Sequence, residues 1–353
     1  MDAAGITTEE LQLAARNHGI PLEALRHDVT PLGLHYLLTH YDIPVVDPAA
    51  WSLEVGGHVA TPLALSLDAL RARPDAVSAQ VTMECAGNGR ARFDPRPISQ
   101  PWLLEAVGNA EWTGVPLRAV LAEAGVLDGA VEVLFTGLDR GVEGGVEQTY
   151  ERALPLDEAL GDDVLLAYAV NGVPLPPQHG FPLRLLVPGW YGMTSVKWLT
   201  RITVLDERFT GYQNAHAYRW RASVDDVGTP LTRIEPRALL VPPGIPDFMS
   251  RERFVDAGPV VLEGRAWSGW APIAEVEVST DGGATWAAAE VEPSPAGPRA
   301  WSRWRFAWDA APGTYVLACR ARDASGRAQP DSAEWNVGGY AHTAPQRVPV
   351  TVR

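Results

Sequence analysis

The sequence predicts two domains, a mixed α+β domain followed by an immunoglobulin-like β-sandwich. From about residue 51 to 205, short β-rich runs alternate with modest helical stretches, which indicates a mixed domain. A proline-punctuated stretch at 241–246 interrupts this pattern, and regularly spaced short strands fill roughly the last 100 residues, as in a sandwich. The 30 prolines, 33 glycines and 13 tryptophans also favour short strands, turns and large aromatic anchors over helical bundles.

The mixed domain is preceded by a segment with helical patterns. Residues 7–10 (Thr-Thr-Glu-Glu) form a candidate N-cap for a helix there, ahead of Leu11. Within the mixed domain, the period of the apolar residues distinguishes helices from strands. The predicted elements are helices at 63–73 and 117–125, the second with a glycine stop, and strands at 131–135 and 183–187.

The sandwich is predicted from strands that alternate apolar and polar residues. Asp281, Gly282 and Gly283 supply a turn between two of these strands. The predicted strands lie at 260–267, 273–279, 285–289, 301–308 and 314–320.

Composition excludes several classes of protein. The chain has 353 residues, of which 46% are hydrophobic and 20% charged, as in a globular protein of two or three domains. A net charge of −14 repels nucleic acid and anionic lipid, so an anionic substrate would need a local basic pocket. No apolar run approaches the roughly 20 residues that a membrane helix requires.

Cysteine use narrows the chemistry further. Cys85 and Cys319 lie far apart and outside any CxxC, CxxCH or Cys/His cluster, which excludes a zinc finger, an attached c-type haem and a disulfide framework. Low cysteine use fits a reducing compartment, and the start of the chain lacks the basic and apolar regions of a secretion signal. We therefore expect a cytoplasmic location, or a periplasmic one if a precursor has been trimmed.

Cys85 is the residue that says most about function. It follows a strand-like run at 81–84 and opens a small-residue turn that closes on Arg90. A thiolate beside backbone N–H groups and a guanidinium can hold a metal, although a lone buried cysteine is more often a small core residue. Cys319 alternates like a core residue of a sandwich strand and has no motif around it.

An ordered series of motifs surrounds Cys85. In the mixed domain these are CAGN at 85–88, GNAEWTG at 108–114, LLAYAVNG at 165–172, HGFPLR at 179–184, VPG at 187–189 and SVKWL at 195–199. In the sandwich they are AWSG at 266–269, STDGGATW at 279–286 and WN at 335–336. With this series the chain resembles the molybdenum-containing sulfite oxidase family, in its prokaryotic form without a haem domain.

The resemblance implies an architecture with four parts. These are a helical N-terminal arm (1–30), a molybdopterin-binding catalytic domain (31–225), a linker (226–246) and an immunoglobulin-like dimerisation domain (247–353). It also implies a two-fold homodimer.

The resemblance implies a Mo-molybdopterin cofactor with one molybdenum, held by the thiolate of Cys85. A thiolate is a soft donor that suits a metal cycling between oxidation states. A histidine, an arginine and a lysine from separate loops would form a cradle for the cofactor's phosphate, although each alone could be solvated surface. The implied cofactor-binding residues are His35, Tyr36, Leu37, His40, Cys85, Asp139, His179, Arg184, Ser195, Val196 and Lys197.

Three residues match catalytic positions of the family. Arg90 would clamp a substrate oxyanion, because a guanidinium fork suits two oxygens. Tyr168 would donate a hydrogen bond and shuttle a proton, and Trp102 would form a pocket wall. The alternatives are a surface arginine, a core tyrosine with a bonded hydroxyl, and core packing of the tryptophan.

The chain departs from the family pattern at two positions. Leu38 and Gly338 stand where the family carries two further substrate arginines. Losing both would weaken dianion binding by several kcal/mol, at roughly 1.5–3 kcal/mol for each charged hydrogen bond. His35 and His40 are candidate replacements as partly charged donors, although a lone histidine is more often structural.

Three hypotheses follow. The first is a molybdenum enzyme that oxidises sulfite to sulfate and passes electrons to a separate acceptor, a cytochrome or oxygen, since no haem segment is seen. The second keeps the cofactor but acts on a different or neutral substrate, for example by sulfoxide reduction. The third is a binding or adhesion protein in which Cys85 is merely buried. Neither nucleic acid nor a membrane is an expected partner.

Overall fold

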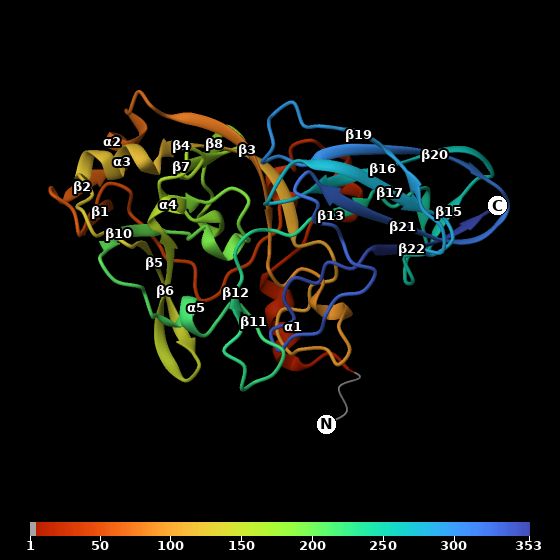
Figure 1. The fold of residues 1–353 in the computed structure, drawn as a ribbon, viewed down its shortest axis with the longest axis horizontal. Coiled ribbons are helices and arrows are strands. Elements are labelled where there is room, and N and C mark those ends of the chain that lie inside the picture. Colours follow the sequence, from red (N-terminus) through yellow and green to blue (C-terminus); the bar gives the residue numbers. More distant parts are fainter. Residues whose placement is uncertain (1–4) are drawn as a thin grey trace.

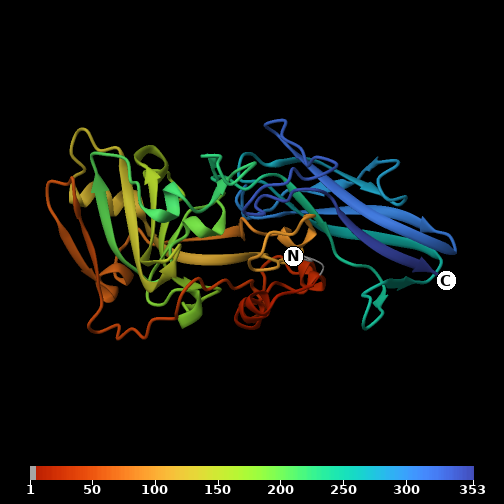
Figure 2. The ribbon, with the colours of Figure 1, turned by 90° about the horizontal axis from the view of Figure 1, so that it is seen from below.

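The computed structural model describes residues 5–353. The prediction that the start of the chain lacks a secretion signal draws on the first four residues, which lie outside them. Two domains lie side by side in Figure 1, and the molecule is elongated in Figure 2. Helix α1 (Thr8–Arg16) lies near their junction. Its N-terminus has the predicted capping box, in which the Thr7 side chain accepts from the Glu10 N–H and Glu10 accepts from the Thr7 N–H.

The first domain contains two sheets with helices at their edges. One sheet has the order β2-β1-β10-β5-β6, with β1 (Ser52–Gly57), β2 (Leu63–Ser66), β5 (Glu132–Glu143), β6 (Val146–Pro155) and β10 (Leu199–Leu205). The other has the order β3-β4-β7-β8, with β3 (Val77–Glu84), β4 (Val107–Pro116), β7 (Leu165–Val170) and β8 (Val173–Pro174), while β9 (Arg184–Leu186) pairs with β7. The α-helices are α2 (Leu67–Arg71), α3 (Leu117–Ala124), α4 (Leu156–Ala159) and α5 (Tyr212–Ala215).

The core of this domain lies between the sheets and under α2 and α3. Leu53, Phe135 and Ile202 from one sheet meet Leu185 from the other and Leu121 of α3, all fully buried. These residues carry the apolar periodicity that the sequence shows, because each faces the same core.

One helix prediction is confirmed and one is half wrong. Helix α3 ends where predicted, at Gly125, whose φ of 69° is left-handed and therefore suits glycine. The predicted helix at 63–73 is a strand in its first half, because β2 pairs with β1. The helix begins only after Ser66, whose hydroxyl accepts the Ala69 N–H as a cap.

The second domain is a β-sandwich, as predicted. One sheet has the order β13-β16-β20-β19, with β13 (Arg237–Leu240), β16 (Gly258–Trp267), β19 (Glu290–Glu292) and β20 (Ser302–Ala310). The other has the order β14-β15-β22-β21-β17-β18, with β14 (Ile245–Pro246), β15 (Arg253–Val255), β17 (Ile273–Ser279), β18 (Ala287–Ala288), β21 (Gly313–Asp323) and β22 (Gln346–Val352). Trp304, Leu317 and Cys319 lie in the core between them, so Cys319 packs as predicted.

The predicted linker at 226–246 contains part of the sandwich. Strand β13 pairs antiparallel with β16 and is buried along its whole length. Prolines around it suggest an irregular segment, but the apolar run between them completes a sheet. A small hairpin of β11 (Arg219–Trp220) and β12 (Thr229–Pro230) precedes it.

A buried carboxylate joins the two domains directly beside Cys85. Glu84, the last residue of β3, forms an ion pair with Arg237 of the sandwich, with 2.9 Å between Oε1 and Nε. Its other oxygen accepts the indole N–H of Trp267 at 2.8 Å, and Asn88 donates to Oε1 at 3.0 Å. The turn that carries Cys85 is therefore fixed from both domains.

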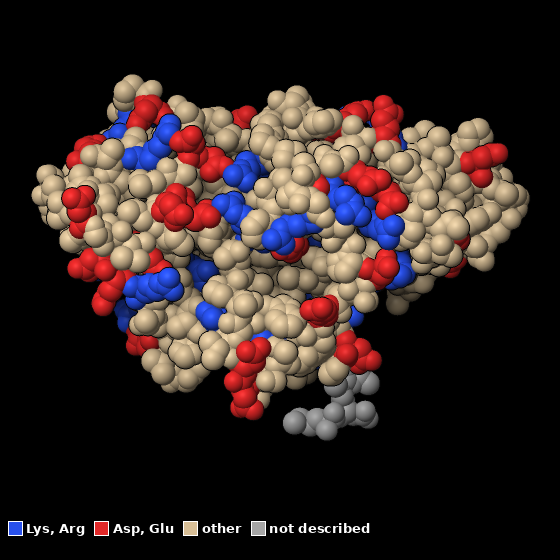
Figure 3. Space-filling view, viewed as in Figure 1, with Lys and Arg blue, Asp and Glu red and all other residues tan. Residues whose placement is uncertain are grey.

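The surface matches the acidic composition only in part. Figure 3 shows acidic and basic side chains interspersed, with basic ones gathered across the middle of that face above a hollow. In the described part of the chain, no helix has the length and apolar character needed to cross a membrane.

Candidate active site

Cys85 lies immediately after β3, at the start of a tight turn. Its N–H donates to the carbonyl of Ala106, and its carbonyl accepts the N–H of Asn88, both at 2.9 Å. A Cβ at Gly87 would lie 2.6 Å from Nη1 of Arg90, so the glycine leaves room for the guanidinium in its present position. Burial raises the pKa of the Cys85 thiol, against the opposing effects of the Arg90 charge and the Gly87 N–H.

Within residues 5–353, no group of three or more His, Cys, Asp and Glu side chains could hold a metal ion. A metal at Cys85 would therefore take its other ligands from outside the protein. This fits a metal held mainly by the sulfurs of an organic cofactor.

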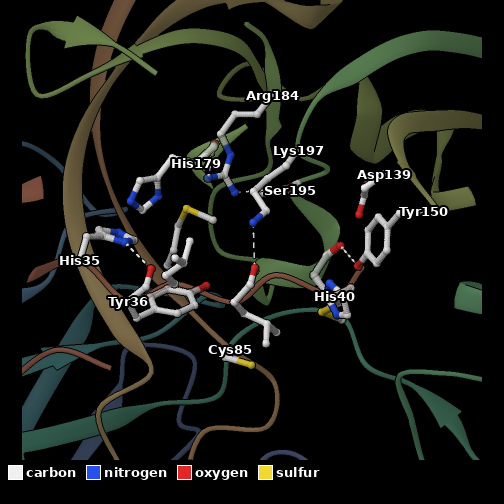
Figure 4. Close-up of a pocket in the computed structure, with 15 residues that line it drawn as sticks. His35, Tyr36, His40, Cys85, Asp139, Tyr150, His179, Arg184, Ser195 and Lys197 are labelled. Carbon is white, nitrogen blue, oxygen red and sulfur yellow. Dashed lines mark hydrogen bonds between the residues drawn. The ribbon is translucent and has the colours of Figure 1, made fainter. Parts of the chain in front are cut away.

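A polar pocket extends from Cys85 into the first domain, and we call it the cofactor pocket (Figure 4). Ten of the predicted cofactor-binding residues line it: His35, Tyr36, Leu37, His40, Cys85, Asp139, His179, Arg184, Ser195 and Lys197. Val196 is the exception, because its side chain points into the core between the sheets. Neighbouring residues on an extended segment face opposite sides, so Ser195 and Lys197 reach the pocket and Val196 does not.

Two cations, the buried Arg184 and the half-buried Lys197, face the cofactor pocket without a salt-bridge partner in the described chain. Arg184 donates to the carbonyls of His179 (3.2 Å) and Ser195 (3.1 Å), and its Nε is buried without a hydrogen bond there. Lys197 donates to the carbonyls of Leu38 (2.8 Å) and Gln178 (3.0 Å). Burial lowers the pKa of Arg184 to about 10 and that of Lys197 to about 7. Both residues would gain from a bound anion such as a phosphate.

The histidines of the site do not act as cations in this structure. Burial lowers the pKa of His35 to about 4 and that of His40 to about 3, and neighbouring positive charges contribute. The pKa of His179 is lowered for the same reasons. The hypothesis that His35 and His40 replace the missing arginines as partly charged donors is therefore wrong for this state.

A second cavity of about 230 Å³ opens on the other side of Cys85, and we call it the substrate cavity. Leu38, His40 and Cys85 line both cavities. Its walls come from α1, the 85–100 segment, the β5–β6 hairpin and the aromatic residues Tyr218 and Tyr340. Leu13 of α1 is among the lining residues, so the N-terminal arm forms part of the wall.

Arg90 lies in the substrate cavity, as predicted. Its Nε donates to the carbonyl of Gly338 (2.9 Å) and its Nη1 to that of Gln100 (3.1 Å). Leu38 also lines the cavity and Gly338 accepts from Arg90, so both positions that lack the family arginine belong to this site. Among the described lining residues, Arg90 is the only arginine or lysine.

Tyr168 lies elsewhere, and the prediction of a catalytic role for it is wrong. It stands on β7 and packs at the edge of the domain core, 6.0 Å from the Arg71 guanidinium. Tyr218 supplies the phenol instead, because its hydroxyl lies within hydrogen-bonding distance of His40 Nε2 in the substrate cavity. Sequence reasoning missed Tyr218 because it belongs to an irregular segment whose position depends on the whole domain.

Trp102 is close to the metal ligand but does not line the substrate cavity. It is buried in the same core cluster as Cys85, and its indole N–H contributes to lowering the pKa of that thiol. The prediction of a wall residue is therefore corrected to one that packs behind the cysteine.

Comparisons with known proteins agree with this geometry. Residues 40–213 match the oxidoreductase molybdopterin-binding domain, and residues 243–353 match the Mo-co oxidoreductase dimerisation domain. Sulfite oxidase of Gallus gallus is 35% identical over 333 residues, covering 90% of this chain and 72% of that protein. Mitochondrial sulfite oxidase of Mus musculus is 34% identical, and the match covers 92% of this chain and 62% of that protein. An NADH nitrate reductase of Brassica napus is 30% identical, and the match covers 95% of this chain and 40% of that protein.

A solved structure is similar over the whole chain. It is the sulfane dehydrogenase SoxCD from Paracoccus pantotrophus, with a TM-score of 0.82, 25% sequence identity, and coverage of 100% of this chain and 89% of that one. The fold and site define a molybdopterin-dependent oxidoreductase. The chain belongs to the sulfite oxidase family. The hypothesis of a mere binding or adhesion protein is thereby excluded.

Proposed function

We propose that this enzyme transfers oxygen to the sulfur of a small substrate, in the first instance sulfite, and passes the electrons to a separate acceptor. The observation that carries the proposal is the position of Cys85 between two cavities: one is lined by two cations without a salt-bridge partner in residues 5–353, and the other is lined by an arginine. Sulfite oxidases and a sulfane dehydrogenase among the similar proteins support a sulfur substrate over nitrate.

The residues of the cofactor pocket have defined tasks in this proposal. Arg184 and Lys197 would hold the phosphate of molybdopterin, and Cys85 would be the protein's ligand to the metal. When bound, the cofactor supplies the transferable oxygen and the two-electron redox chemistry. Oxidation of sulfite adds the oxygen of one water molecule and releases two electrons and two protons.

The residues of the substrate cavity orient the substrate and move a proton. The terminal nitrogen Nη2 of Arg90 makes no hydrogen bond within residues 5–353, so it can donate to a substrate oxygen. The hydroxyl of Tyr218 can donate a second bond and a proton, and the neutral imidazole of His40 is its hydrogen-bond partner.

Sulfite-dependent reduction of ferricyanide by metal-replete enzyme tests the proposal. We expect saturable turnover that Arg90→Lys weakens mainly through KM, because a lysine cannot reproduce the fork of the guanidinium. Absence of turnover with one molybdenum bound per chain would contradict sulfite as substrate.

A neutral substrate is the second candidate, since Leu38 and Gly338 remove two cations from the cavity. Reduction of a sulfoxide consumes two electrons and two protons and yields a thioether and water. Oxidation of reduced methyl viologen by dimethyl sulfoxide measures this reaction. We further propose a homodimer through the sandwich domain, while the cytoplasmic location stays a prediction.

A further inference from the structure

A carboxylate that sequence reasoning did not select lines the substrate cavity. Glu143 ends β5, at the tip of the hairpin with β6, and is partly buried. Among the described residues that line this cavity, Glu143 is the only carboxylate and Arg90 the only strong cation. The imidazole of His40 is neutral, so the formal charge of these walls sums to about zero.

Glu143 is held in a fixed position by one of its two oxygens. Its Oε2 accepts a hydrogen bond from the Tyr41 hydroxyl at 2.9 Å and another from Nε2 of Gln213 at 2.9 Å. Gln213 is itself buried and also donates to the Tyr41 hydroxyl at 3.1 Å. The other carboxylate oxygen of Glu143, Oε1, makes no hydrogen bond within residues 5–353, so it can accept one from a ligand.

The charge of Glu143 reaches the part of the cavity where the substrate would react. Burial is the main cause that raises the pKa values of Tyr218 and Tyr340, and the Glu143 charge contributes to both. The Cζ atom of Arg90 lies over the Tyr340 ring, 5.1 Å from the ring centroid. The centroids of the Tyr340 and Tyr218 rings are 5.6 Å apart. Glu143 and Arg90 therefore both act on the aromatic wall formed by Tyr218 and Tyr340.

We propose that Glu143 determines substrate specificity, by disfavouring dianions and accepting a hydrogen bond from an ammonium or amine group of a sulfur-containing substrate. The proposal rests on the proposed oxygen transfer at sulfur and, of the two candidate substrates, favours an uncharged or amine-bearing sulfur compound over sulfite. Arg90 binds an oxygen of the reacting group, and Glu143 binds the positively charged or donor end of the same molecule. A cavity with three arginines would favour the opposite charge distribution.

Glu143→Gln tests the charge alone, because glutamine keeps the shape and an oxygen that accepts from Tyr41 and Gln213. The matched control is Glu147→Gln. Glu147 lies on β6 of the same hairpin, but it is exposed, pairs with Arg140 and lies outside the cavity. Both variants remove one negative charge, so a general effect of net charge would appear in both.

The first measurement is the dissociation constant of the holoenzyme for sulfate, by isothermal titration calorimetry. We expect Glu143→Gln to bind sulfate on the order of tenfold more tightly, from the loss of one unit charge in a partly buried site. The gain shrinks at high salt, and Glu147→Gln behaves like the wild type. Unchanged or weaker binding in Glu143→Gln would overturn the proposal.

The second measurement compares two sulfoxides, dimethyl sulfoxide and 2-aminoethyl methyl sulfoxide, as ligands of the holoenzyme. We expect the wild type and Glu147→Gln to prefer the ammonium-bearing compound roughly tenfold, and Glu143→Gln to lose that preference. If the wild type shows no preference, or if all three proteins show an equal preference, then Glu143 does not accept a hydrogen bond from the ammonium group.

Neither binding experiment requires turnover. If sulfite and sulfoxide both fail as substrates while the sulfate affinity still responds to Glu143→Gln, the proposed reaction fails and the specificity role of Glu143 stands. If turnover is observed and the affinities do not respond to Glu143→Gln, the proposed reaction stands and the specificity role of Glu143 fails.

Discussion

At the scale of single residues, the site depends on groups whose charge is unusual for their type. Arg184 and Lys197 are cations without a salt-bridge partner in the described chain, and the pKa of Lys197 is lowered to about 7 by burial. Asp139 lines the same pocket, and burial raises the pKa of its carboxyl to about 6. A site of this kind is less stable when empty than when filled, because a bound anion restores the missing interactions.

Cys85→Ser should abolish molybdenum binding, because a hydroxyl is a far poorer ligand than a thiolate. The matched control is Cys319→Ala, which removes the other cysteine from the sandwich core. We expect about one molybdenum per chain in the control and almost none in Cys85→Ser, measured by elemental analysis of the purified proteins. Equal molybdenum in both would show that Cys85 is not the ligand.

The lowered pKa of Lys197 predicts how the stability of cofactor-free protein depends on pH. Between about pH 7 and the unfolded value of 10.5, the unfolded chain holds a proton on this lysine that the folded chain lacks. The free energy of unfolding therefore rises with pH in this window, by a fraction of the roughly 1.4 kcal/mol per pH unit possible for one group. Urea unfolding from pH 7 to 10 measures it, and Lys197→Met should flatten the rise.

Asp139 makes the opposite contribution at lower pH. Its pKa is raised from 3.8 to about 6, so between these values the folded chain holds a proton that the unfolded chain lacks. This contribution to stability is present below pH 3.8 and is lost as the pH rises through about 6. Asp139→Asn should remove that decline, which urea unfolding below pH 7 measures.

At the scale of elements, the end of β3 connects the metal ligand to the sandwich. Glu84 is fully buried and binds Arg237 and Trp267, which belong to β13 and β16, while Asn88 binds it from the turn of Cys85. Because the carboxylate precedes Cys85 directly, a change in the docking of the domains would reach the metal site.

Glu84→Gln should therefore destabilise the protein strongly. It removes one charge of a buried ion pair and leaves Arg237 uncompensated, which costs about 3–5 kcal/mol. The matched control is Glu54→Gln in an exposed pair with Arg201, where the expected loss is about 0–1 kcal/mol. Urea unfolding monitored by tryptophan fluorescence compares the two, and similar losses would contradict the importance ascribed to burial.

At the scale of the whole molecule, the sandwich carries apolar residues that the monomer leaves in solvent. Phe248 and Met249 are 84% and 83% exposed, in the loop between β14 and β15. This loop belongs to the segment that matches a dimerisation domain. Large exposed apolar side chains of this kind are typical of interfaces.

We expect the protein to have about twice the mass of the 38.1 kDa chain in solution. The double substitution Phe248→Asp and Met249→Asp should shift it toward the monomer, because burial of two carboxylates in an interface is unfavourable. Val227→Asp, at an equally exposed position outside the sandwich, is the control and should leave the mass unchanged. Size-exclusion chromatography with light scattering measures all three, and a monomeric wild type would contradict the expectation.

Sequence alone determined the parts of this protein that depend on local patterns and short motifs. The alternation of apolar residues predicted several of the strands, and a glycine predicted the end of α3 at Gly125. The series of motifs predicted the family and ten residues of the cofactor pocket. Motif residues could be located because backbone turns and cofactor contacts restrict residue type at each position.

Only the tertiary structure decided which side chains meet in the substrate cavity. Tyr168 fitted a motif yet faces the core, whereas Tyr218 and Glu143 have no motif and line the cavity. These residues come from separate segments, and their positions are set by the packing of two sheets and an N-terminal helix. The charge of His40 was likewise decided by burial, because the cost of desolvating an imidazolium depends on everything packed around it.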